Sequence, residues 1–250
     1  HEKGKDFSGL CVYFMNRMML AYLFDKTEEA LENGERSFAL IDNVIAGPHV
    51  SPIHFYYGLT LLRAAGEMPK KRRRNLRRAG SVLQKIKKFA KSAPENNLAK
   101  QYLMEAELHR MRKNNPRAAS LYQQAIETSR KNGFLHEEAM ANELAAMFWE
   151  TNRDSEQSLR YLLEARRLYQ KWGATAKVNL LDRKYSLKKS GKPFSTEKTI
   201  SRTGFQTSSE IDMLSLTKAA LAISGEIQLG KLMSQLMHVV VENAGAQNGF

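Results

Sequence analysis

Apolar residues recur with the period of an α-helix along most of the chain. Within residues 117–130, five apolar side chains fall on one helical face: Ala118, Leu121, Tyr122, Ala125 and Ile126. After Asn132-Gly133 a second apolar face follows: Met140, Leu144, Met147 and Phe148. Two amphipathic helices joined by a short polar turn predict a helical hairpin.

The sequence also aligns with itself at an offset of 40 residues. Small and apolar residues coincide at this offset: Ile86 with Ile126, Ala99 with Ala139, Ala106 with Ala146, Ala125 with Ala165, and Gly133 with Gly173. Gly133 and Gly173 are typical of helix C-termini that need a left-handed residue, and Pro94 and Pro116 are typical of helix starts. The residues typical of helix ends and helix starts therefore agree with the 40-residue repeat.

This period predicts hairpins at about 78–113, 116–151 and 155–185, preceded by less regular helices at about 5–24, 27–46 and 51–66. A single hairpin cannot bury its apolar face alone, so neighbours must stack into a curved array with a continuous core. We therefore predict an all-α fold, in which residues 1–185 form a tetratricopeptide-like (TPR-like) α-solenoid.

The composition changes after residue 185. Ten of the 24 residues in 186–209 are Ser or Thr, which predicts a linker. Residues 210–224 then read as an amphipathic helix, and we expect 210–250 to be the N-terminal helices of a second domain that continues beyond Phe250. The helix at 210–224 is a candidate for pairing with its copy in a homodimer.

Charge is concentrated in one segment. The formal net charge is +13, and residues 70–91 alone hold eleven Lys and Arg with no Asp or Glu. Five arginines in this segment are candidates for contact with an acidic partner or with phosphate: Arg72, Arg73, Arg74, Arg77 and Arg78. Nucleic-acid binding through 70–91 is the alternative function, although no aromatic residues are interleaved with these charges. A charged helix surface or a contact to an acidic protein is the simpler interpretation.

Catalytic, cofactor and metal motifs are not found. Gly191-Lys192 is followed by Pro193, which excludes a phosphate loop, and His136-Glu137-Glu138 has Met140 where a zinc helix needs its second histidine. We therefore predict a chain that is not an enzyme and holds no cofactor or metal. Three polar residues remain as weak candidates for a partner groove: Asn142, Arg166 and Gln170.

Two bulk features concern location. The most apolar stretch, residues 11–24, is too short to cross a bilayer and contains Asn16 and Arg17, so no membrane span is predicted. A single cysteine, Cys11, fits a reducing compartment, and we expect a cytoplasmic protein.

Several short motifs occur in the order of a known family. They include Ala93-Pro94-Glu95-Asn96-Asn97, Asn132-Gly133-Phe134, Ala141-Asn142-Glu143-Leu144-Ala145, Trp172-Gly173-Ala174, Ala222-Ile223-Ser224-Gly225-Glu226-Ile227 and Glu242-Asn243-Ala244-Gly245-Ala246-Gln247. With these motifs the chain resembles the helical-repeat region and the start of the GAF domain in large multidomain signalling proteins, which carry a Ser/Thr kinase-like domain, an AAA-type ATPase, a GAF domain and a sensor histidine kinase. The resemblance implies a non-catalytic connector of a two-component signal-transduction protein, which contacts the adjacent domains of the same protein.

Overall fold

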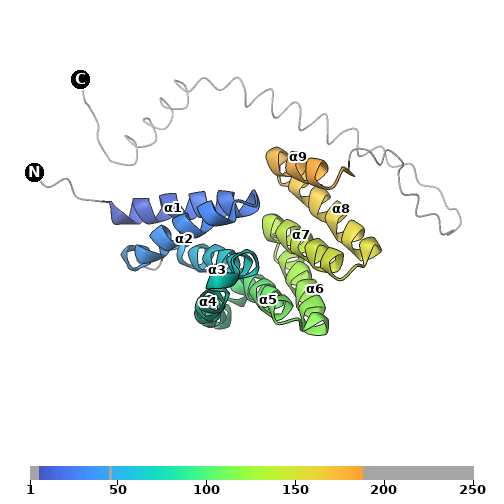
Figure 1. The fold of residues 1–250 in the computed structure, drawn as a ribbon. Helices are drawn as coiled ribbons and strands as arrows, with labels where there is room; N and C mark the ends of the chain where they lie inside the picture. The colour runs from blue at the N-terminus through green and yellow to red at the C-terminus, as the bar shows by residue number, and fades with distance from the viewer. Residues whose placement is uncertain (1–5, 45–46, 188–250) are drawn as a thin grey trace, which may run out of the picture. The chain divides into compact units, whose positions relative to one another are not determined.

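The structure is a computed structural model, and it describes residues 6–44 and 47–187. This part of the chain contains helices and no strand (Figure 1): α1 (Phe7–Leu23), α2 (Thr27–Ala39), η1 (Ile41–Asn43), α3 (Val50–Glu67), η2 (Pro69–Lys71), α4 (Arg72–Ser92), α5 (Pro94–Met111), α6 (Asn115–Lys131), α7 (Leu135–Thr151), α8 (Ser155–Lys171) and α9 (Thr175–Lys184). The all-α class is confirmed for the described residues. The predicted linker from residue 188 onward, the second domain at 210–250 and the pairing helix at 210–224 lie outside them, so this division of the chain stays a prediction.

The helices are arranged in two layers. The odd-numbered helices contact one another along the inside, α1 with α3, α3 with α5, and α5 with α7. Twelve of the 18 residues of α3 are buried, whereas only six of the 21 residues of α4 are. A helix that is buried on most sides forms a core, and one that is buried along a single stripe covers it. The even-numbered helices α2, α4, α6 and α8 therefore form the outer layer.

The closest helix pairs differ from the predicted hairpins. The most extensive contacts join α1 with α2, α3 with α4, α5 with α6, and α7 with α8. The sequence period instead suggested pairing α4 with α5 and α6 with α7, and it placed the start of α4 near residue 78 rather than at Arg72. The offset of 40 itself is kept, since α6 begins at Asn115 and α8 begins at Ser155. A repeat defines how often a unit recurs and leaves open which neighbour each helix packs against most closely.

One turn geometry recurs between the helices. The second residue after α1, α5, α6, α7 and α8 is left-handed, with φ of 59° at Asp25, 60° at Lys113, 74° at Gly133, 62° at Arg153 and 83° at Gly173. The next amide then donates back across the helix end, as in Phe134 N to Ser129 O at 2.9 Å and Asp154 N to Trp149 O at 3.0 Å. This bond satisfies a carbonyl at the end of the helix. The predicted role of Gly133 and Gly173 is confirmed.

Aromatic side chains form much of the core. Tyr57, Phe55, Tyr122, Phe148 and Tyr169 are among the largest fully buried side chains. Tyr122 and Phe148 belong to the apolar helical faces that the sequence predicts, and their burial confirms those faces. Trp172, by contrast, is 42% exposed and lies against His136, with ring centroids 5.5 Å apart. Trp172 follows α8 and lies at the surface rather than in the core.

Candidate functional site

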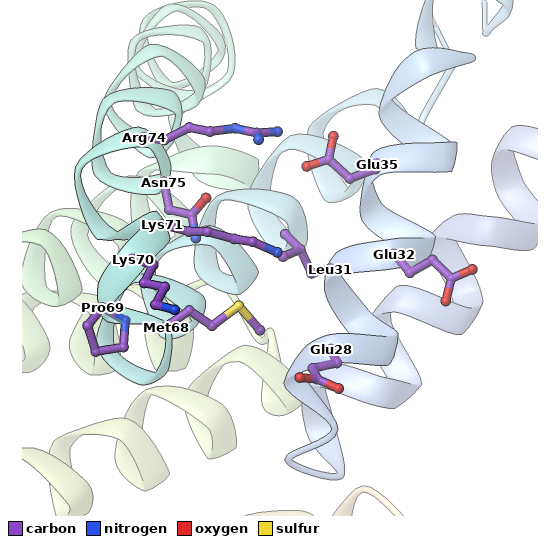
Figure 2. Close-up of a pocket in the computed structure, with 10 residues that line it drawn as sticks. All are labelled: Glu28, Leu31, Glu32, Glu35, Met68, Pro69, Lys70, Lys71, Arg74 and Asn75. Carbon is purple, nitrogen blue, oxygen red and sulfur yellow. The ribbon is translucent and has the colours of Figure 1, made fainter.

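The candidate site is a groove between α2 and the corner where α3 passes into α4 (Figure 2). We call it the α2–η2 groove. Its cavity volume is about 910 Å³, and ten residues line it: Glu28, Leu31, Glu32, Glu35, Met68, Pro69, Lys70, Lys71, Arg74 and Asn75. One wall comes from α2 and the other from η2 and the first turn of α4. Leu31, Met68 and Pro69 supply the apolar part of the lining.

Proline and arginine build the corner that carries the basic wall. Pro69 is the first residue of η2, a position where its missing N–H costs nothing, and it redirects the chain after α3. Arg72 then donates to Ala65 O at 3.3 Å and to Met111 O at 2.8 Å. These bonds attach the start of α4 to the ends of α3 and α5. The Arg72 guanidinium thus has a structural task.

The acidic wall is partly neutralised from within. Glu28, Glu32 and Glu35 lie on one face of α2 because they are four and three residues apart. Glu35 accepts two hydrogen bonds from Arg78, at 2.5 and 2.7 Å, and these lower the pKa of its carboxyl group. Glu32 pairs with Arg36 at 2.6 Å. Among the described residues, Glu28 has no ion-pair partner.

The basic wall is not neutralised in this way. Lys70, Lys71 and Arg74 are exposed and make no ion pair within the described ranges. Figure 2 shows Lys71 extending toward Leu31, and Arg74 extending toward the wall that carries Glu35. After Arg78, Arg74 also helps to lower the pKa of Glu35, whereas Lys70 and Lys71 have no ion-pair partner in the described ranges. Three cations without an ion pair thus face one such carboxylate, and the groove favours a negatively charged ligand.

Asn75 adds an unused donor at the same place. Its side chain is 2% exposed, and its Nδ2 atom has no hydrogen-bond acceptor in the described part of the chain. Leaving a buried amide donor unpaired costs about 1–3 kcal/mol. Because the Asn75 amide lies at the edge of the groove and lacks an acceptor in the described residues, it is a candidate contact for an oxygen atom of a ligand.

The structure separates the five candidate arginines of the basic segment. Arg72 and Arg78 are engaged inside the protein, and Arg78 also donates to the Tyr57 hydroxyl. Arg74 lines the α2–η2 groove, whereas Arg73 and Arg77 are exposed outside its lining. Contact of these residues with a partner stays a prediction.

The weaker candidates Asn142, Arg166 and Gln170 are not gathered around one open groove. Asn142 is 2% exposed and donates to Glu138 O at 2.8 Å, so it is part of the interior. Arg166 donates to Asp182 at 2.6 and 3.0 Å and to Gln170 at 3.4 Å. Their role in partner contact is likewise untested.

A second polar site was not anticipated from the sequence. Lys177 of α9 is 4% exposed, and its Nζ donates to Glu143 Oε1 at 2.7 Å and to Leu23 O, at the end of α1, at 2.5 Å. Tyr169 donates to the other Glu143 oxygen at 2.8 Å, and burial together with this carboxylate raises the pKa of Tyr169 well above its ordinary value. We call Lys177, Glu143, Tyr169 and Leu23 O the clasp, because they join the first helix to the last described one. The only hint in the sequence is the run of carboxylates on the otherwise apolar helix at 135–151.

Metal-binding clusters and membrane-spanning helices are both absent from the described residues. Within 6–44 and 47–187 no group of three or more His, Cys, Asp or Glu side chains has the arrangement of a metal site. No helix in these ranges is long and apolar enough to cross a membrane.

A family model matches part of the chain that carries these features, and α1 and α2 lie outside the match. The model is described as soluble NSF attachment protein, SNAP, and it matches residues 60–190, which is more than half of the chain. The chain belongs to this family. No curated protein and no solved structure matches it. The SNAP match runs from within α3 through α9 and so includes η2, the basic segment and Lys177.

The SNAP match corrects the resemblance stated from sequence motifs. The assignment to multidomain signalling proteins, with GAF, ATPase and sensor histidine kinase modules, is wrong, and so is the two-component function inferred from it. The motifs behind it within residues 93–174 are rich in small residues and helix-end signals, which stacked helices need whatever their family, and the motifs at 222–227 and 242–247 lie outside the described residues. Contacts to adjacent domains of the same protein find no support, and the nucleic-acid alternative gains none. A family of attachment proteins does support a chain without catalytic activity.

Proposed function

We propose that this chain is a non-catalytic adaptor that attaches protein partners, NSF among them, through the outer surface of its stacked helices. The family name describes attachment to NSF. The inner layer supports the same idea, because several buried charged side chains of α5, α7 and α9 are already paired inside the protein. Examples are Glu107 with Arg110 at 2.6 Å and Lys100 with Glu137 at 2.6 Å. Partner contacts therefore fall to the outer layer and to the turns.

The basic surface of η2 and α4 is the observation that carries this proposal. Lys70, Lys71, Arg73, Arg74 and Arg77 are exposed and make no ion pair within the described ranges. Uncompensated cations on one face attract an acidic protein surface, raise the association rate and fix its orientation. The partner surface is thus expected to be acidic.

Binding of the 250-residue chain to purified NSF, followed by biolayer interferometry over a salt series, tests the proposal. We expect binding that weakens as salt rises, because exposed charge pairs are screened. The double variant Arg73→Glu, Arg77→Glu should bind at least about tenfold more weakly. Its matched control is Lys131→Glu, Lys171→Glu, which reverses two exposed cations on α6 and α8. Absence of wild-type binding at low salt, or an equal loss in both variants, contradicts the proposal.

We also propose a location and an oligomeric state. We place the adaptor in the cytoplasm, and the single cysteine, Cys11, which is buried and unpaired, is consistent with a reducing compartment. We also retain the proposal that the helix at 210–224 pairs with its copy in a homodimer. Light scattering on the full chain and on the Ile211→Asp, Leu214→Asp variant tests it, and an unchanged mass contradicts it.

A further inference from the structure

We propose that the α2–η2 groove is the docking site for a short peptide segment of a protein partner, and that this segment combines leucine-like and acidic side chains. The inference rests on the proposed adaptor function and assigns a place and a chemistry to one of its contacts. It is drawn from the apolar lining, the charge of the two walls and the unused donor of Asn75.

The apolar lining requires an apolar group in the ligand. Leu31 and Met68 are half-buried, and they line the groove between the charged walls (Figure 2). A free phosphate or another small anion would leave this surface in contact with water. A leucine or isoleucine side chain would cover it and gain about 25 cal/mol for each Å² removed from water. The ligand is therefore amphipathic.

The charge of the walls determines the polar part. Within the described ranges Lys70, Lys71 and Arg74 make no ion pair, whereas Glu35 and Glu32 are already paired with Arg78 and Arg36. An acidic side chain on the ligand would pair with the basic wall. A basic ligand would meet only Glu28 as an uncompensated carboxylate. Acidic segments are favoured for this reason.

Asn75 points to a peptide backbone. Its Nδ2 is closed off from solvent and has no acceptor among the described residues, so a rotation of the Asn75 side chain would let a carbonyl oxygen of the bound segment satisfy it. The acidic wall from Glu28 to Glu35 spans about two turns of α2, or ~10 Å, which equals the length of about three extended residues. A segment of this size can place an apolar residue on Leu31 and Met68 and an acidic residue beside it.

Fluorescence anisotropy with synthetic peptides tests the proposal on the full 250-residue chain. The probe is a labelled peptide in which leucine pairs alternate with aspartate pairs. We expect it to bind, and we expect weaker binding by at least about tenfold when lysine replaces aspartate or serine replaces leucine. Equal binding of the lysine peptide, or equal binding of the serine peptide as an anion alone, overturns the proposal.

Matched variants locate the site. The triple variant Lys70→Gln, Lys71→Gln, Arg74→Gln should bind the probe at least about tenfold more weakly. The control triple Lys85→Gln, Lys88→Gln, Lys91→Gln removes the same charge from exposed positions farther along α4 and should bind as the wild type does. An equal loss of probe affinity in both triple variants means that only the net charge matters, and it overturns the proposal that the groove is the binding site.

The variant Asn75→Leu separates binding from folding. It removes the unused donor, so the thermal midpoint of the free chain should stay the same or rise, while probe affinity should fall about two- to tenfold. A purely structural role of Asn75 predicts no change in affinity. If NSF still binds and these peptides do not, the groove inference fails while the adaptor function stands. If NSF does not bind and the peptides do, the reverse holds.

Discussion

Replacing Lys177 with Met should destabilise the fold strongly. The ammonium group of Lys177 lies between the carboxylate of Glu143 and the carbonyl oxygen of Leu23, at 2.7 and 2.5 Å, and the side chains of Lys177 and Glu143 are 4% and 6% exposed. Methionine fills a similar volume but leaves Glu143 as a buried carboxylate with only the Tyr169 hydroxyl as partner. Breaking a buried ion pair in this way costs about 3–5 kcal/mol.

The expected loss translates into a measurable shift of the thermal midpoint. A domain of this size loses about 2–4 °C for each kcal/mol, so about 3 kcal/mol corresponds to a fall of about 6–12 °C. Differential scanning calorimetry of wild type and Lys177→Met measures the shift directly. Urea denaturation gives the free energy of unfolding independently.

The double variant Glu143→Gln, Lys177→Met tests the cause. It removes both charges, and the amide oxygen of Gln can still accept from Tyr169, so it should be more stable than Lys177→Met by about 2 kcal/mol. Lys184→Met is the matched control: its partner Asp25 is at 2.8 Å, but the two side chains are 37% and 32% exposed. An exposed pair of this kind contributes less than about 1 kcal/mol. A loss below about 0.5 kcal/mol in Lys177→Met, or a double variant no more stable than the single one, refutes the reasoning.

Three further predictions concern backbone and pH. Gly34→Ala should lower the stability of the fold by about 1–3 kcal/mol, because the new Cβ would lie 2.7 Å from the buried ring of Tyr57. Gly80→Ala, whose new Cβ would have nothing within 4 Å, should raise the stability by about 0.5–1 kcal/mol. Equal urea midpoints for the two variants would contradict this prediction. Arg153→Gly should gain about 0.5–1 kcal/mol by relieving a left-handed φ of 62°, and a lower thermal midpoint speaks against it. Burial lowers the pKa of His54 below 6.5 in the folded state. The stability that the neutral His54 side chain contributes is therefore complete above pH 6.5 and is lost as the pH falls through the folded-state pKa. The thermal midpoint should drop from pH 7.5 to 5.5, and it should drop by less in His54→Gln. An identical pH dependence in that variant rejects the assignment to His54.

The elements of this fold were accessible from the sequence because each depends on neighbouring residues. Gly133 and Gly173 indicated two helix ends correctly, and Pro94 and Pro116 indicated two starts. The equivalent turns at Lys113 and Arg153 carry the same left-handed geometry without glycine, so their residue type gave no signal. The sequence thus identifies a left-handed turn only where it is occupied by glycine, the residue type that prefers this conformation.

The pairing of helices and the roles of individual charges depend on distant residues instead. Nothing near Arg72 or Arg78 in the sequence distinguishes them from Arg73, yet they reach Met111 and Glu35 across the fold. The clasp has the same character, because Lys177 and Leu23 are 154 residues apart. A cluster of arginines could therefore be recognised as a candidate site, but its free members could be told from its structural members only in three dimensions.

The clasp also bears on where we propose that a partner docks. TPR-like arrays offer a concave face to partners when their ends stay apart. Here α9 reaches the end of α1, where Lys177 donates to the backbone carbonyl of Leu23 and Lys184 donates to the Asp25 carboxylate. Arg63 shows the consequence: it donates to Tyr22 O at 2.6 Å, lies over the Tyr22 ring and is 3.3 Å from Asp25. Charges used in this way are no longer available for a ligand. In the described ranges Lys70, Lys71 and Arg74, where the chain turns from α3 into α4, are exposed and make no ion pair. A partner would therefore gain more from the charges of the proposed α2–η2 groove than from the paired charges of the inner layer.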